Sequence, residues 1–375
     1  NGFGVPLSFN AIEQIDVVKG APPVLFGSSQ RNGGFVNLHS KTASTDQRKG
    51  NVKVSAGSWD KYSAQVDYNA PIVEDKIGLR VSYEHIDQGS YYDYSATQSD
   101  SLFAALKVLP DDKSSWDINF ELYQTEFTDN AGINRPTQAL IDHNLYITGQ
   151  GLQANGSTVP GAGSIISPTG QVKIDTSRVL TDPDNLNQAT TYLVHSIYKR
   201  ALSDVMSIKN ISYFQHLQRE EIAQNSFVEI IDGADTAQNR TELTYQWSDE
   251  QQTLFAVDVR YNKVLGYSQF TTEADTPIDL TGPLSNRRIP LTDAQKARLV
   301  ELRPGVYVSP GGQYDINNDG SGDFNLSDTT DSRSWQTGLA IQQDSDWGDK
   351  LHTSVGYRVD FYDVEANDPI APQGQ

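Results

Sequence analysis

Residues Ile12–Lys41 read IEQIDVVKGAPPVLFGSSQRNGGFVNLHSK, and no other segment of this 375-residue chain restricts its architecture as narrowly. An apolar run ends at Gly20 and is followed by a turn that contains two prolines. Beyond a polar loop, the pair Gly33–Gly34 precedes a second apolar run, Phe35–Leu38. Adjacent glycines allow positive φ or close backbone approach, and prolines fix φ and remove a hydrogen-bond donor. The segment therefore predicts a compact strand–turn–strand unit.

This segment resembles the late plug domain of TonB-dependent outer-membrane receptors. Two departures from the family pattern stand out: the prolines fall at positions 22 and 23 instead of directly after Gly20, and Phe26 replaces the usual tyrosine. The residues that carry the resemblance are Ile12, Glu13, Ile15, Asp16, Val17, Lys19, Gly20, Val24, Leu25, Phe26, Gly27, Gly33, Gly34, Asn37 and Lys41.

The composition of the chain is polar, with 37% hydrophobic residues, a mean hydropathy of −0.51 and a net charge of −19. Such values are typical of soluble proteins, and no apolar run reaches the roughly 18 residues of a transmembrane helix. The lack of such a run does not exclude a transmembrane β-barrel, because only one face of each of its strands is apolar. The negative charge argues against nucleic acid as a partner. With no cysteine in the chain, a disulfide framework and a thiolate metal site are both excluded.

Period-two alternation of apolar and polar residues recurs along the chain and predicts eleven strands. In Leu351–Phe361, for example, apolar side chains alternate with histidine, serine, glycine, arginine and aspartate. Alternation places one set of side chains on an apolar face and the other on a polar face. The predicted strands cover residues 51–58, 61–70, 76–86, 98–108, 115–128, 189–200, 206–219, 239–248, 252–263, 332–343 and 350–362.

The connections between these strands distinguish a membrane barrel from a soluble sandwich. Short connections at 71–75, 109–114, 201–205, 249–251 and 344–349 alternate with mostly long ones at 87–97, 129–188, 220–238 and 264–331. Short turns on one side and long loops on the other are typical of outer-membrane barrels. In the last loop, Thr292 and Gln295 have the spacing of a capping box at the start of a short helix.

Together, pattern and resemblance predict an all-β protein, a transmembrane antiparallel β-barrel preceded by the C-terminal part of a plug domain. The resemblance implies a 22-stranded barrel, of which this chain holds about half. We expect the plug segment at 1–46 and the N-terminal half of the barrel, with long extracellular loops, at 47–375. The early plug, the energy-coupling segment and the remaining strands are expected to lie outside this chain.

The resemblance implies energy-coupled uptake of a scarce ligand across the bacterial outer membrane, with the TonB complex of the inner membrane as partner. A ferric siderophore is the commonest cargo of the family, so iron is expected only as part of the cargo and no cofactor is required. Glycans and cobalamin are alternative cargoes for the same fold. An alternative of another class is a soluble, calcium-dependent glycan-binding β-protein.

The sequence contains none of the common catalytic motifs. The six histidines show no metal-ligand spacing, and no GxSxG elbow, P-loop or cysteine nucleophile is present. The carboxylates scatter along the polar faces of the strands and the loops, where charged side chains are ordinarily solvated. We therefore predict that the protein is not an enzyme.

Aromatic and polar residues on loops are the candidates for ligand binding. Three tyrosines crowd the connection 87–97, where stiff amphipathic rings suit ligand capture. An aromatic girdle at the membrane interface is the alternative explanation. The resemblance adds two aromatic positions at the plug apex and two polar residues beside them, with packing against the barrel wall as the alternative. The candidate residues are Phe3, Phe26, Gln30, Arg31, Tyr91, Tyr92 and Tyr94.

The segment 315–323 reads DINNDGSGD and matches the first nine positions of an EF-hand-type calcium loop. Its oxygen donors would be Asp315, Asn317, Asp319, Ser321 through its carbonyl, and Asp323. Position twelve is Leu326 instead of the bidentate glutamate, so an EF-hand proper is not expected. Asp, Asn and Gly are also common turn formers. A structural calcium site and an ion-free acidic turn thus both remain open.

Overall fold

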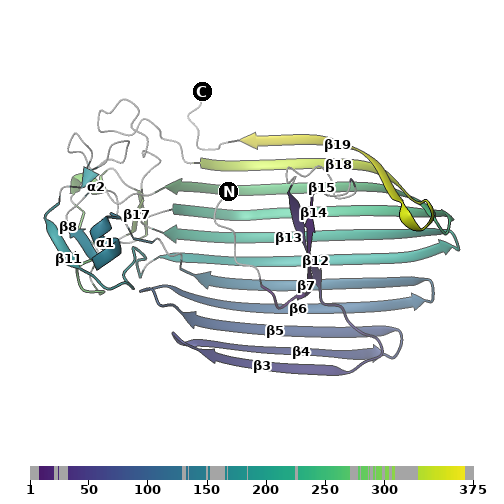
Figure 1. Cartoon of the computed structure of the whole chain (residues 1–375), viewed down its shortest axis with the longest axis horizontal. Helices are drawn as coiled ribbons and strands as arrows, with labels where there is room; N and C mark the ends of the chain where they lie inside the picture. The colour runs from purple at the N-terminus through teal and green to yellow at the C-terminus, as the bar shows by residue number, and fades with distance from the viewer. Residues whose placement is uncertain are drawn as a thin grey trace.

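One large antiparallel sheet dominates the computed structural model of the chain (Figure 1). The model describes residues 8–20, 24, 33–128, 132–133, 135–148, 151–152, 165–166, 168–183, 185–223, 227–270, 278, 280–285, 287, 290–291, 293–297, 300–303, 306–308 and 328–367. The eleven strands of the sheet are β3 (Lys49–Gly57), β4 (Lys61–Val73), β5 (Ile77–Gly89), β6 (Ala96–Asp111), β7 (Ser114–Phe127), β12 (Leu186–Ser203), β13 (Met206–Ala223), β14 (Phe227–Ser248), β15 (Gln251–Phe270), β18 (Asp328–Asp346) and β19 (His352–Asn367). Each strand pairs with its neighbours in chain order, so β3 and β19 form the two edges.

Shorter elements lie outside this sheet. They are β1 (Ile12–Lys19), β2 (Gly34–Ser40), α1 (Gln138–His143), β8 (Leu145–Thr148), β9 (Gly151–Leu152), β10 (Ile165–Ile166), β11 (Gly170–Lys173), α2 (Asp293–Lys296), β16 (Val300–Arg303), β17 (Val306–Val308) and the 3-10 helix Gly348–Lys350. No helix in the described ranges is long and apolar enough to cross a membrane.

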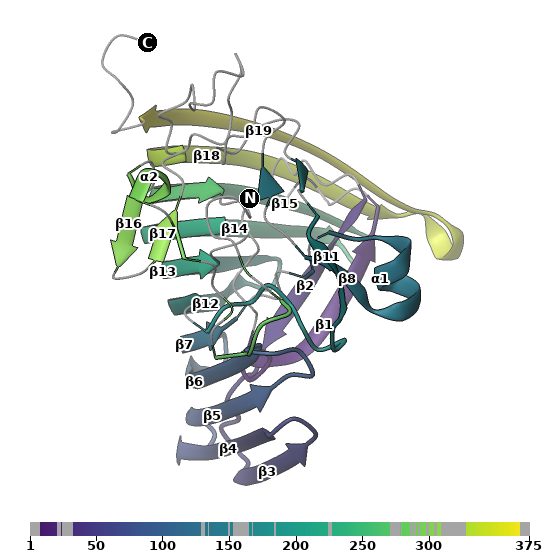
Figure 2. The same ribbon diagram turned by 90° about the vertical axis from the view of Figure 1, so that its left-hand side faces the viewer.

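The predicted strand–turn–strand unit is confirmed as the antiparallel pair β1–β2, in which Val17 lies opposite Val36. Gly34 has a φ of 129°, and a Cβ there would collide with the carbonyl oxygen of Val18. Glycine is therefore needed where the second strand begins. Figure 2 shows the large sheet as an arc with β1 and β2 on its concave side.

Side chains alternate between the two faces of the sheet as the sequence predicts. On β6, Leu102 is exposed on the convex face, whereas Phe103 is buried against Ala11 and Ala43 of the plug segment. Large apolar side chains form a band along the convex face, among them Val81, Leu102, Phe120, Tyr192, Val257, Leu339 and Tyr357. An exposed apolar band of this kind is the surface that a membrane barrel turns toward lipid.

The two ends of the sheet differ in their connections, as Figure 1 shows. At one end, which we call the turn end, neighbouring strands are joined at residues 74–76, 112–113, 204–205, 249–250 and 347–351. At the other, the loop end, β7 and β12 are separated by residues 128–185, and β15 and β18 by residues 271–327. All eleven predicted strands overlap observed ones. The five predicted short connections all lie at the turn end, and the two longest predicted connections both lie at the loop end.

One predicted loop, 220–238, is wrong. β13 and β14 continue through it and leave only residues 224–226 between them. On the concave face, the buried Arg219 pairs with Glu221 and with Glu229, which lies opposite Glu221 in the register. Because one arginine neutralises two facing carboxylates, the strands stay paired beyond the apolar band. The run of charges obscures the alternation that the sequence analysis relies on.

A buried ion pair joins β15 and β19 across β18 on the concave face. The guanidinium of Arg358 on β19 lies 2.7 Å from Asp258 on β15 and 2.6 Å from Asp360. To reach Asp258 it crosses β18 at Gly338, where a Cβ would collide with it. Glycine at position 338 is therefore what allows β15 and β19 to share this arginine.

We predict that Gly338→Ala displaces the Arg358 side chain and lowers the free energy of unfolding of the full-length receptor by about 1–3 kcal/mol, as overpacking typically does. Urea titration of the refolded receptor measures this change. Gly57→Ala is the matched control, because a Cβ at Gly57 would make only an ordinary contact with Lys61. Equal unfolding midpoints for the two variants would contradict the prediction.

Candidate functional site

A single buried asparagine anchors the plug segment to the sheet. The Asn10 amide nitrogen donates to the carbonyl oxygens of Ser82 and Ser101, both at 3.1 Å. Its side-chain oxygen accepts from the Ser82 hydroxyl at 2.6 Å and from the Gln65 amide at 3.1 Å. Asn10 is completely buried, so these bonds replace its contacts with water. One plug residue thereby holds three neighbouring strands, β4, β5 and β6.

An ion-pair cluster extends this anchor toward the turn end. The Lys41 ammonium lies 2.6 Å from Asp67 and donates to the Ser82 hydroxyl at 3.1 Å. Arg80 grips the same aspartate with two nitrogens, at 2.9 and 3.2 Å, and also donates to the Thr42 carbonyl at 3.2 Å. Lys41 is the last residue of the plug motif. The structure thus gives this motif position a role in fixing the plug to the barrel wall.

A small apolar cluster accompanies these polar contacts between the plug segment and the sheet. The buried cluster at this interface consists of Ala11 and Ala43 from the plug segment and Phe103 and Ala105 from β6. Beside this cluster, hydrogen bonds and ion pairs of Asn10 and Lys41 join the plug segment to the wall. Water can replace such bonds when the surfaces separate, whereas exposed apolar surface has no substitute partner.

The long connections at the loop end pack together into a unit that we call the loop cap. Its buried core combines Leu140, Tyr146, Ile174 and Leu180 from residues 128–185 with Ile278 and Leu280 from residues 271–327. Thr137 caps the start of helix α1, where its hydroxyl accepts from the Leu140 amide, and Asn144 caps the end in the left-handed conformation. β8 and β11 then pair beside it. The described parts of the two loops therefore share one buried core.

Two arginines bind the parts of the loop cap to one another through backbone carbonyls. Arg287 is buried and donates to the Val179 carbonyl at 2.8 Å and to that of Thr181. Burial lowers the pKa of its guanidinium, and nearby Asp182 opposes this shift. Arg178 donates to the Gly282 carbonyl at 3.1 Å. Since carbonyl oxygens carry no residue-specific signal, the sequence could not reveal these contacts.

The three candidate tyrosines lie on the connection 90–95, at the edge of the loop cap. The Tyr94 hydroxyl donates to the Leu284 carbonyl at 2.6 Å, and Arg287 lies over its ring at 4.9 Å. Tyr91 hydrogen-bonds Thr176 and makes edge contacts with Trp59 and Tyr92, with ring centroids 6.2 and 5.4 Å apart.

Tyr94 thus contributes to packing within the loop cap, whereas Tyr91 and Tyr92 remain exposed. Neither the ligand-binding role nor the girdle alternative is decided by these contacts, and ligand binding by the tyrosines stays a prediction.

The other predicted site residues fall outside the described ranges. These are the plug positions Phe3, Phe26, Gln30 and Arg31 and the calcium-loop residues Asp315, Asn317, Asp319, Ser321 and Asp323. Thr292, the predicted helix cap, is also outside them, although α2 begins at the next residue. Within the part of the chain that the structure describes, no three acidic or histidine side chains gather as metal ligands.

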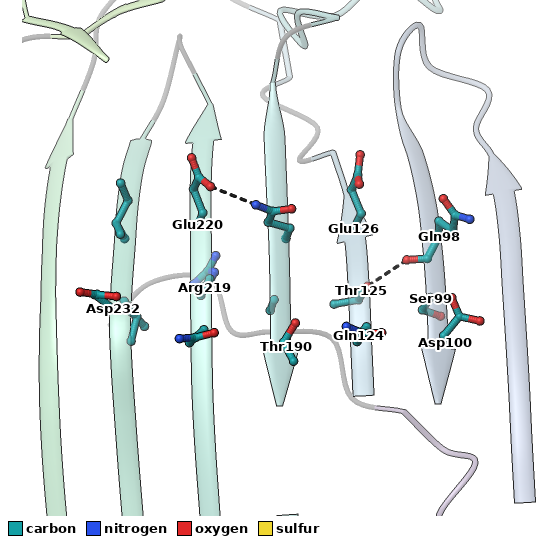
Figure 3. A pocket seen from close by; sticks show the side chains of 15 residues that line it. Gln98, Ser99, Asp100, Gln124, Thr125, Glu126, Thr190, Arg219, Glu220 and Asp232 are labelled. Atoms are coloured by element: carbon teal, nitrogen blue, oxygen red, sulfur yellow. Dashed lines mark hydrogen bonds between the residues drawn. The ribbon is translucent and has the colours of Figure 1, made fainter. Parts of the chain in front are cut away.

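A polar hollow of about 600 Å³ crosses β6, β7, β12, β13 and β14 near the loop end. Figure 3 shows Asp100, Glu126, Thr190 and Glu220 on neighbouring strands of this hollow. By alternation these side chains share the convex face with Leu102 and Tyr192 of the apolar band. The hollow therefore lies on the outer surface just beyond the band, and it does not open into the concave side where the plug sits.

The known proteins that this chain resembles are all receptors. No protein-family model matches the sequence. The ferripyoverdine receptor of Pseudomonas aeruginosa is 31% identical over 106 residues, which make up 28% of this chain and 13% of that receptor. The metal-pseudopaline receptor CntO of the same species is 33% identical over 88 residues, or 23% of this chain and 12% of the receptor.

Solved structures match almost the whole chain. The ferripyoverdine receptor of the P. aeruginosa outer membrane, bound to ferripyoverdine, superposes with a TM-score of 0.64 at 15% identity, over 96% of this chain and 43% of that one. The ferric-catecholate import receptor Fiu of E. coli gives a TM-score of 0.63 at 14% identity, over 98% and 54%. The chain therefore spans about half the length of the solved receptors it matches.

The fold is that of the outer-membrane receptors that the chain matches, with the plug strands on the concave side of a large antiparallel sheet. The resemblance to TonB-dependent siderophore receptors that the plug motif indicates is confirmed. The loop end of the sheet corresponds to the extracellular side and the turn end to the periplasmic side.

We predict that Asn10→Ala weakens the seating of the plug in the full-length receptor. The change leaves buried partners on three strands unsatisfied, at about 1–3 kcal/mol for each group. Channel recordings in planar lipid bilayers should show more frequent ion leakage than in wild type. Gln14→Ala, which removes only an exposed bond to Asp16 within β1, should behave like wild type. Equal leakage in both variants would contradict the assigned role of Asn10.

A second prediction concerns the loop cap. Arg287→Ala removes two hydrogen bonds to backbone carbonyls and should lower local stability by about 1–3 kcal/mol. Hydrogen exchange should then accelerate at the Leu180 amide, which donates to the Gly132 carbonyl at 2.9 Å. Lys173→Ala on the exposed strand β11 is the control. Unchanged exchange at Leu180 in Arg287→Ala would show that the loop cap holds together without this arginine.

Proposed function

We propose that this chain is part of a receptor that takes up a ferric siderophore across the outer membrane in an energy-coupled way. The observation that carries the proposal is the seating of the plug strands on the barrel wall through Asn10 and Lys41. The proposed partners are the siderophore complex outside the cell and the TonB complex of the inner membrane. Iron enters as cargo, and no resident cofactor is required.

The physical argument starts from the width of the lumen. A barrel of about 22 strands encloses an aqueous channel unless a plug fills it. A plug held by hydrogen bonds and ion pairs can shift when force is applied, because water takes over the broken bonds. An apolar interface of the same size would resist separation more strongly, since its surfaces would have to be hydrated. The polar seat of Asn10 and Lys41 suits a plug that must be moved and then return.

The cargo is inferred from what the similar receptors bind. One relative is named for ferripyoverdine and another for a metal–pseudopaline complex, and both names denote chelated metal ions. A ferric siderophore is therefore favoured over a glycan or cobalamin. The matched proteins are transport receptors, which agrees with a role in uptake instead of catalysis.

We propose that the cargo binds between the plug apex and the loop cap. The proposed contact residues are Phe3, Phe26, Gln30 and Arg31 of the plug, together with Tyr91, Tyr92 and Tyr94. Tyr91 and Tyr92 are half exposed on a loop that is braced by its neighbours, so their rings can meet a ligand with little loss of conformational freedom. Tyr94 would act through the position of this loop, because its hydroxyl already holds Leu284.

A deletion strain grown on single siderophores as sole iron source tests the proposal. We expect one siderophore to support growth only when the full-length receptor is restored, and a protonophore to abolish uptake of the labelled iron complex. Tyr91→Ala with Tyr92→Ala should weaken binding of that siderophore by about 2 kcal/mol or more, as truncated aromatic anchors do. The cargo assignment is wrong if the deletion strain grows on every siderophore and the restored receptor instead supports uptake of a glycan or cobalamin.

Calcium binding at 315–323 remains a prediction, since the segment lies outside the described residues. We propose a structural role, in which the ion neutralises clustered aspartates within the long loop 271–327. Titration calorimetry on the full-length receptor should detect calcium binding in wild type and a weaker signal in Asp319→Ala. Identical heats in the two proteins would mean that this segment is an ion-free turn.

A further inference from the structure

One arginine on the concave face of the large sheet differs from the others in having no acidic partner. Arg260 on β15 follows Asp258 by two residues and therefore shares its concave face. In the part of the chain that the structure describes, Arg260 makes no ion pair, and its Nε donates to the Asn262 side-chain oxygen at 3.1 Å. The other concave arginines each bind a carboxylate, in the pairs Arg80–Asp67, Arg219–Glu221, Arg240–Glu242 and Arg358–Asp258.

The residues around Arg260 leave its charge uncompensated. The nearest carboxylate on the same strand, Asp258, is buried and lies 2.7 Å from Arg358. The residues opposite Arg260 in the register are Gln238 on β14 and Gln336 on β18, and both are uncharged amides. Because Arg260 is also exposed toward the concave side, its guanidinium can receive an anion that comes from outside the wall.

The strand register places Arg260 in a row of polar and aromatic side chains that crosses the concave wall. We call this set the Arg260 row, and its members, each opposite the next, are Asn119, His195, Tyr213, Gln238, Arg260, Gln336 and Tyr362. The rings of His195 and Tyr213 meet edge-on, with centroids 6.3 Å apart. Tyr362 is exposed. No member of the row is a carboxylate, so the row as a whole suits an anion.

The depth of the Arg260 row relates it to the plug segment. Val24 lies against Gly356 on β19, where an added Cβ would collide with it. Gly356 lies opposite Gln342, which lies opposite Leu254 on β15. Arg260 follows Leu254 toward the loop end by about 20 Å along the strand, at roughly 3.3 Å per residue. The row is therefore on the loop-cap side of this plug contact, which is where we propose that the cargo binds.

We propose that Arg260 binds a carboxylate of the ferric siderophore and makes the receptor selective for anionic chelates. This inference rests on the proposed function. The planar guanidinium presents its donors as a fork that matches the two oxygens of a carboxylate. Beside it, the Gln238 amide offers hydrogen-bonding groups and the Tyr362 ring an aromatic surface for the rest of the chelate.

The charge of the chain explains why a single arginine can decide this selectivity. The net charge is −19, so the protein as a whole repels an anionic chelate. The other concave arginines are already neutralised by carboxylates, and Arg260 is the guanidinium on this wall that remains available among the described residues. An anionic cargo therefore gains a specific contact at Arg260 that a neutral chelate does not gain.

Arg260→Gln in the full-length receptor tests the inference, because it removes the charge and keeps a polar side chain. The probe is the ferric siderophore that restores growth of the deletion strain, and quenching of tryptophan fluorescence measures its Kd. We expect the Kd to rise about 10- to 100-fold, as loss of a hydrogen bond to a charged group causes. Arg333→Gln is the matched control and should bind like wild type, since Arg333 lies on the convex face of β18 and pairs with Glu365 at 3.1 Å.

The methyl ester of the same siderophore distinguishes a direct contact from an indirect one. We expect wild type to bind the ester about as weakly as Arg260→Gln binds the acid, and Arg260→Gln to bind acid and ester alike. An unchanged Kd in Arg260→Gln, a restoring siderophore without a carboxylate, or equal affinity of wild type for acid and ester would overturn the inference. An equal loss for acid and ester in Arg260→Gln would also overturn it and would assign Arg260 to a carboxylate of the plug.

Two further outcomes are separated by design. If no siderophore restores growth, the proposed function itself is wrong and the inference falls with it, whereas an unchanged Kd for a restoring siderophore overturns the role of Arg260 alone. Heat-modifiable migration verifies that each variant is folded. If Arg260→Gln does not assemble, the comparison of acid and ester on the wild-type receptor decides, because equal affinities contradict a carboxylate contact.

Discussion

Every backbone polar group that faces lipid must find its partner within the protein, and the rest of this structure depends on that constraint. Eleven neighbouring strands meet it by pairing in chain order, which is the simplest way to leave no interior strand unpaired. Pairing makes the side-chain period two, so each strand separates one apolar row from one polar row. The apolar rows meet lipid and the polar rows line the inner wall.

The polar inner wall in turn defines how the plug can be held. Its side chains are serines, amides and charges, so the plug contributes matching groups at Asn10 and Lys41. The lipid-facing rows permit no such chemistry at low cost, and the polar side chains of Asn210, Asn239 and Thr241 on β13 and β14 bond one another. Beyond the membrane the constraint relaxes, and the β13–β14 hairpin carries charge on its concave face at Arg219 and on its convex face at Glu220.

The fold could be predicted from the sequence because the alternation of apolar and polar residues indicates the strands and the connection lengths indicate a membrane barrel. The ends of the strands could not be predicted, because charged residues such as Glu221 and Glu229 continue a strand when an arginine pairs with both of them. The plug strands were predictable from glycines and prolines that the backbone requires, as Gly34 illustrates. Asn10 precedes the plug motif and has no pattern of its own. The loop cap depends on arginines that bind backbone carbonyls, and its contacts follow from tertiary structure alone.

The claim at the centre of this account is that Asn10 seats the plug on the barrel wall and that this seat must open for uptake. Asn10→Cys combined with Ser101→Cys tests it most directly, because the two side chains face each other, with the Asn10 amide nitrogen 3.2 Å from the Ser101 hydroxyl oxygen. The account predicts a disulfide in the full-length receptor that blocks siderophore uptake and leaves siderophore binding intact, with uptake restored by a reductant. Uptake at the wild-type rate through a receptor in which the disulfide is fully formed would contradict it.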